Sequence, residues 1–138
     1  MKKILIPGLV AGLVMLVAAM VVGWLTTLVL PSMAQEYGNA SLYRTWSDPI
    51  VYVYFVYPFF LGIALAWVWN TTKGVIGKGS LWVKGSRFAR AFWLVSALPG
   101  ILMTYSTFPI SLAVALSWLL SSLVQLVCAG FVYAKMNK

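Results

Sequence analysis

Long apolar runs separated by short polar stretches dominate the pattern of this chain. The four runs cover roughly residues 4–30, 50–70, 89–105 and 110–134. A membrane-spanning helix needs about 20 mainly apolar residues, because each residue adds about 1.5 Å across a hydrocarbon core about 30 Å thick. The pattern therefore predicts an all-α integral membrane protein, a single domain over 1–138 with four transmembrane helices in an antiparallel bundle.

The first apolar run follows two lysines, an arrangement that is also typical of a secretory signal peptide. The apolar region of a signal is usually about 7–15 residues long. The run over 4–30 has 27 residues. We therefore expect it to be kept as the first transmembrane helix, tilted to fit its length.

The composition agrees with a membrane protein. The chain is 62% hydrophobic and only 9% charged, which is too apolar for a soluble domain of this size to bury. The chain has ten Lys and Arg residues but only two acids, an excess of positive charge that would also favour binding of nucleic acid. The cations lie between apolar runs and not on a polar domain, so no nucleic-acid partner is expected.

The basic residues also predict the orientation of the helices. Except for Arg44, they lie before the first run, between the second and third runs or at their edges, and after the fourth. The positive-inside rule then places both termini and the middle segment in the cytoplasm. We expect a multi-pass protein of a prokaryotic cytoplasmic (inner) membrane.

The middle segment between the second and third runs is both basic and rich in glycine. Its glycines predict a mobile loop: Gly74, Gly77, Gly79 and Gly85. Its cations either bind anionic lipid headgroups or act only as topology signals: Lys73, Lys78, Lys84, Arg87 and Arg90.

The polar segment between the first and second runs carries both acids of the chain, Glu36 and Asp48. Asp48 precedes a proline, which predicts a helix N-cap followed by the first helical position. Arg44 lies four residues earlier and is a candidate ion-pair partner, while Trp46 suits an aromatic belt at the outer interface. A structural role is the first interpretation, and a binding site is the alternative.

Two prolines lie inside predicted spans, Pro58 in the second and Pro99 in the third. Each removes a backbone hydrogen bond and predicts a kink. Broken helices flank substrate sites in many transporters, although prolines are also common in ordinary transmembrane helices.

Small residues follow one face of the first predicted helix: Gly8, Gly12, Ala19 and Gly23. Such a face lets helix backbones approach closely, and close packing drives helix association in lipid. It predicts a homo-oligomer or a subunit of a larger membrane complex, unless the face packs against helices of the same chain.

A polar seam is predicted between the third and fourth helices: Ser96, Thr104, Thr107, Ser121, Ser122 and Gln125. Gln125 is costly in hydrocarbon without a partner. The seam is interpreted first as hydrogen-bonding glue between helices. The alternative is the lining of a path for water or a solute.

Residues for catalysis or metal binding are scarce. The chain has one cysteine, Cys128, and no histidine, so zinc sites of the usual type, redox cysteine pairs and a Ser-His-Asp triad are not expected. No cofactor, metal or enzymatic activity is expected. The only enzyme alternative would work at the outer interface through Glu36, Arg44 and Asp48, where no nucleophile or base is evident.

Two hypotheses of function follow. The first is a packing protein that self-associates or serves as an accessory subunit. The alternative is a passive channel or facilitator for a small solute or ion, lined by the Ser/Thr/Gln seam.

Overall fold

The computed structural model describes residues 2–137, and among these it is made of helices without any strand. Four helical runs are long and apolar enough to cross a membrane, which confirms the predicted number. They are α1 (Lys2–Val29), η1 with α3 (Pro49–Tyr52, Val53–Ile76), α4 with η2 and α5 (Leu81–Phe92, Trp93–Ala97, Leu98–Thr107), and α6 (Leu112–Met136).

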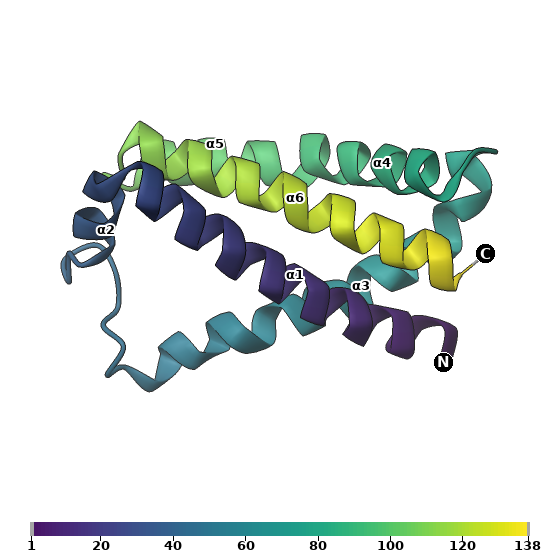
Figure 1. The fold of residues 1–138 in the computed structure, drawn as a ribbon, viewed down its shortest axis with the longest axis horizontal. Coiled ribbons are helices and arrows are strands. Elements are labelled where there is room, and N and C mark those ends of the chain that lie inside the picture. Colours follow the sequence, from purple (N-terminus) through teal and green to yellow (C-terminus); the bar gives the residue numbers. More distant parts are fainter. Residues whose placement is uncertain (1, 138) are drawn as a thin grey trace.

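The helices lie side by side in the order α3, α1, α6 and α4, as the most extensive contacts and Figure 1 show. The side-chain amide of Asn137 donates to the backbone carbonyl of Lys3 at 2.8 Å. The first and last helices therefore meet at one end of the molecule, called here the terminal end. The opposite end, which carries residues 38–48, is called the loop end.

The crossing of α1 and α3 depends on glycines. A Cβ atom added at Gly12 would lie 2.7 Å from the Cα of Phe59 and 2.9 Å from the carbonyl oxygen of Pro58. From the other side, a Cβ at Gly62 would lie 2.8 Å from the backbone nitrogen of Gly12. Gly8 meets Ile63 in the same way. Part of the predicted small-residue face is thus occupied within the chain.

The rest of that face is open. Ala19 is half-buried, and Gly23 is exposed with no atom within 4 Å of an added Cβ. Within the chain, close packing therefore involves only the part of this face at Gly8 and Gly12, and contact of the loop-end part with a partner stays a prediction. The reason is that α3 diverges from α1 beyond the crossing at Gly12, as Figure 1 shows.

The middle segment is mostly helical, which corrects the prediction of a mobile loop. Helix α3 continues to Ile76, α4 begins at Leu81, and only four residues connect them. Ser80 caps α4 by accepting a hydrogen bond from the backbone N–H of Val83 at 3.3 Å. The third span is correspondingly longer than the predicted 89–105, and its first turns are basic and amphipathic.

Gly85 lies in a close contact between two helices and not in a flexible connection. It faces Gly130 at the crossing of α4 and α6, where a Cβ on Gly85 would lie 2.8 Å from the backbone carbonyl carbon of Gly130. The glycine serves close packing and not flexibility. In the true connection, Gly77 and Gly79 have φ of 85° and 157°, values that suit glycine.

The terminal half of the protein has a closed aromatic core. Trp69, Phe88 and Tyr133 come from three helices, and the ring centroids of Trp69 and Phe88 lie 5.2 Å apart. The buried Tyr133 hydroxyl donates to the carbonyl oxygen of Gly62 at 2.8 Å. Helices α3, α4 and α6 are therefore held together at this end.

The predicted outer segment contains a short helix that the sequence reading missed, α2 (Pro31–Tyr37). Met33 on this helix is fully buried against the start of α6. The Glu36 carboxylate accepts a hydrogen bond from the Ser111 backbone N–H at 2.8 Å, and the Trp118 indole donates to the Tyr37 hydroxyl at 3.0 Å. The segment is thereby fixed to α6.

Candidate functional site

The third span is irregular where Pro99 enters it. Proline has no N–H to donate to the carbonyl of Val95, four residues earlier. The five residues of η2 form a π-helical turn immediately before α5, in which the Leu98 N–H donates to the carbonyl of Trp93. Such single-turn π segments interrupt α-helices and often occur at functional sites. The Trp93 indole fixes this turn by donating to the carbonyl of Leu119 at 3.0 Å.

A crevice of about 370 Å³ opens beside this turn, between α3, α5 and α6. Here it is called the crevice, and its polar lining residues are Tyr57, Ser96, Thr104, Ser122 and Gln125. Met15 lines it from the middle of α1, and Ser122 and Gln125 lie near the middle of α6. The crevice thus extends from near half the depth of the helices towards the loop end, and residues beside both span prolines border it.

Three of the polar side chains of the crevice, Thr104, Ser122 and Gln125, form hydrogen bonds within their own helices and not across them. The Gln125 amide donates to the Ser121 hydroxyl at 3.0 Å, and Ser122 and Thr104 donate to carbonyls of Leu119 and Gly100 at 2.8 Å. Over residues 2–137, no hydrogen bond links one of the six seam residues to another helix. Their acceptor oxygens are therefore available to a bound molecule.

The chemistry of the crevice is mainly apolar with a few polar groups, the composition typical of small-molecule sites. No Asp, Glu, Lys or Arg is among its lining residues in the described part of the chain. A charged solute in the crevice would find no side chain of opposite charge among these lining residues, and its burial would be strongly disfavoured. The lining therefore suits an uncharged molecule that can donate hydrogen bonds.

The crevice is closed towards the terminal end. Leu65, Phe92 and Leu126 line it, and the first two lie one helical turn from Trp69 and Phe88 of the aromatic core. Phe88 and Phe92 have ring centroids 4.7 Å apart. Movement of a molecule from the crevice to the terminal end requires these side chains to be displaced.

The structure places the predicted seam residues in two groups. Four of them border the crevice, whereas Thr107 is exposed near the end of α5 and Ser121 contributes only as the partner of Gln125. Tyr57 also lines the crevice and was not among the residues predicted from the sequence. Its position directly before Pro58 was the available signal.

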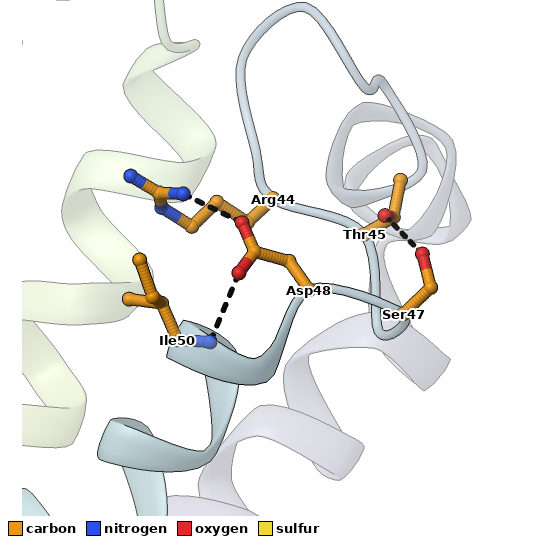
Figure 2. A network of polar contacts seen from close by, with 5 residues as sticks. All are labelled: Arg44, Thr45, Ser47, Asp48 and Ile50. Atoms are coloured by element: carbon orange, nitrogen blue, oxygen red, sulfur yellow. Dashed lines mark hydrogen bonds and ion pairs between the residues drawn. The ribbon is translucent and has the colours of Figure 1, made fainter.

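The loop end carries the predicted polar network (Figure 2). Asp48 accepts a hydrogen bond from the Ile50 backbone N–H at 2.9 Å and pairs with Arg44 at 2.6 Å. The predicted cap and ion pair are confirmed. The cap bond and the Arg44 guanidinium both hold the pKa of Asp48 below its ordinary value. Trp46 is exposed and lies 6.4 Å from the Phe55 ring.

Both acids of the chain are thus engaged in structural contacts. The hydroxyl of the neighbouring Tyr43 is buried without a partner among the residues described. Burial and the Glu36 carboxylate raise the pKa of Tyr43 to about 12, so the hydroxyl keeps its proton at neutral pH. This cluster packs as a cap over the start of α6.

Replacing Asp48 by Ala should loosen the start of the second span. Hydrogen exchange at the Ile50 amide is expected to become severalfold faster, because its acceptor is lost. In the unmodified protein the same amide should lose protection in acid. The pKa of Asp48 is lower in the folded protein than its ordinary value of 3.8, so the ionised carboxylate stabilises the folded state above pH 3.8. This contribution is lost as the pH falls through the lowered pKa.

The matched control is Ser47→Ala, because Ser47 bonds to the Thr45 hydroxyl at 2.8 Å and not to the Ile50 amide. Equal exchange at Ile50 in both variants would contradict the capping role of Asp48.

The predicted lipid-binding cations are spread along the middle segment. The Arg87 guanidinium donates to the backbone carbonyls of Ile76 and Lys78 at 3.1 and 3.3 Å and so caps the C-terminal end of α3. Lys78 lies in the connection and is exposed, whereas Lys73 and Lys84 are half-buried on α3 and α4. Arg87 thus has a structural partner of its own.

The four helices define a multi-pass membrane protein by their length and composition. Comparison of the chain with protein families, curated proteins and solved structures finds no match.

Proposed function

We propose that the protein is a facilitator that binds a small uncharged molecule in the crevice and allows it to cross the membrane. The observation that carries the proposal is the convergence of Tyr57, Ser96, Thr104, Ser122 and Gln125 on one cavity that extends from near the middle of the spans towards the loop end. The crevice borders the π-helical turn before Pro99 and the residue before Pro58. Irregular helices at mid-membrane depth are a common feature of transporter sites.

The proposal includes the orientation and location. Both termini and the connection after α3 face the cytoplasm of a prokaryotic cell, which the distribution of Lys and Arg supports. The crevice then lies in the middle and outer part of the membrane and is closed towards the cytoplasm. The absence of charge in its described lining supports an uncharged solute over the ion considered from the sequence.

Swelling of proteoliposomes in urea or glycerol tests the proposal. The unmodified protein should accelerate swelling, and Gln125→Leu should reduce the protein-dependent rate about tenfold, because the solute loses a hydrogen-bonding partner in a low-dielectric site. The melting temperature should change little, because the only bond lost joins two residues of one helix.

Ser117→Ala is the matched control on α6. Ser117 is buried and donates to its own helix at Val114, but it does not line the crevice. Swelling that survives Gln125→Leu, or equal swelling of empty and protein-containing liposomes in both solutes, would contradict the facilitator proposal.

Self-association or an accessory role is the second candidate, favoured by one observation. Gly23 belongs to the small-residue face of α1, and a Cβ added there would meet no atom of another helix among the described residues within 4 Å. A second helix could therefore approach it closely. Native mass spectrometry of gently extracted protein should then show an oligomer or complex that Gly23→Leu dissociates; a monomer in both samples would reject this role.

A further inference from the structure

An apolar groove of about 850 Å³ lies on the face of α6, between α1 and Trp82 of α4. It is separate from the crevice and shares no lining residue with it. Val10 and Val14 form one wall, Val124 and Val127 belong to its α6 surface, and Lys135 lies near one end. Lys135 is the one charged residue that lines this groove in the part of the chain that the structure describes.

The length of the groove matches the depth of one lipid leaflet. Its α6 residues extend from Leu123 to Met136, a rise of about 20 Å at 1.5 Å per residue, with Lys135 in the last turn. Half of a hydrocarbon core about 30 Å thick is about 15 Å. The groove therefore extends from near mid-membrane to the surface at the terminal end.

The surface end of the groove has the groups that a phospholipid headgroup needs. Lys135 is exposed in the last turn of α6, and its ammonium group can pair with a phosphate. Trp82 comes from the first turn of α4 and lies 6.5 Å from the Phe131 ring. Tryptophan is favoured at the level of headgroups, where its ring is partly in water.

We propose that this groove binds one acyl chain of an anionic phospholipid, in the leaflet at the terminal end, with the phosphate at Lys135. The apolar walls take the chain, and the single cation selects the charge of the headgroup. The proposal places the lipid site on α6, and not on the five cations of the middle segment. It is independent of the proposed transport through the crevice.

Native mass spectrometry of the detergent-purified protein tests this site. Phosphatidylglycerol and phosphatidylcholine with identical chains are added at equal concentration, and the bound fractions are compared. The unmodified protein should prefer phosphatidylglycerol about fivefold, the effect of one cation near a membrane surface. Lys135→Gln should abolish this preference, while Lys78→Gln, which changes an exposed cation outside the groove, should retain it.

A second variant tests the chain-binding part. Val124→Trp should fill the groove and remove both lipid adducts without lowering the melting temperature. Persistence of the phosphatidylglycerol preference in Lys135→Gln, or of the adducts in Val124→Trp, would overturn the proposal. It would also be overturned if the unmodified protein were a dimer that Val124→Trp dissociates, because a second copy would then cover the groove.

Discussion

Gly12→Leu is expected to unfold the protein, whereas Gly23→Leu is expected to leave it folded. At Gly12 the new side chain meets the backbone of Phe59 and Pro58, which no side-chain rotation can relieve. Overpacking of a core costs about 1–3 kcal/mol, and a clash with backbone belongs at or above the upper end. Thermal unfolding in detergent, followed by circular dichroism, measures the difference.

The two positions form a close comparison, since both glycines lie on α1 and on the same predicted face. Leucine improves helix propensity equally at each. Only the contact with α3 differs, because a Cβ added at Gly23 would have no atom of another helix within 4 Å. Similar melting temperatures for the two variants would show that the α1–α3 crossing is not the source of stability.

Gly130→Leu is expected to have an equally large effect through the other glycine contact. A side chain at this position meets the backbone of Gly85 and separates α4 from α6. The aromatic core around Tyr133, three residues later, should be disturbed with it. A loss of about 3 kcal/mol in the free energy of unfolding is expected, measured by denaturant titration in mixed micelles.

Gly74→Leu provides the control for that substitution. Gly74 lies inside α3, is exposed, and has open space around an added Cβ. It should therefore be tolerated and even slightly stabilising, because glycine is a poor helix former. A destabilised Gly74→Leu together with a stable Gly130→Leu would reverse the packing scheme.

The apolar pattern predicted the four spans well, because lipid imposes a strong requirement for continuous apolar helix. It failed in the middle segment, where α4 begins with basic, amphipathic turns that resemble a loop in composition. A signal was present there: Gly85 and Ala89 form a small pair at helical spacing, as Gly130 and Ala134 do on α6. Gly62 and Ala66 give the same signal on α3.

The crevice could be predicted only in part. Ser96, Thr104, Ser122 and Gln125 are polar residues in apolar runs, which made them visible in the sequence. Their meeting with Tyr57 depends on the path of α3, which is set by the tertiary contact between Gly12 and Gly62. Contacts such as Glu36 with Ser111 are likewise tertiary, and local pattern gives no information about them.

Filling the crevice is the most direct test of its role. Thr104 and Thr107 are both on α5 and each donates to a carbonyl one turn earlier, but only Thr104 lines the crevice. Thr104→Trp and Thr107→Trp are compared in the urea and glycerol swelling assay, after both are shown to be folded. The account predicts that Thr104→Trp loses protein-dependent swelling and Thr107→Trp keeps it; equal swelling in the two variants would contradict a solute site in the crevice.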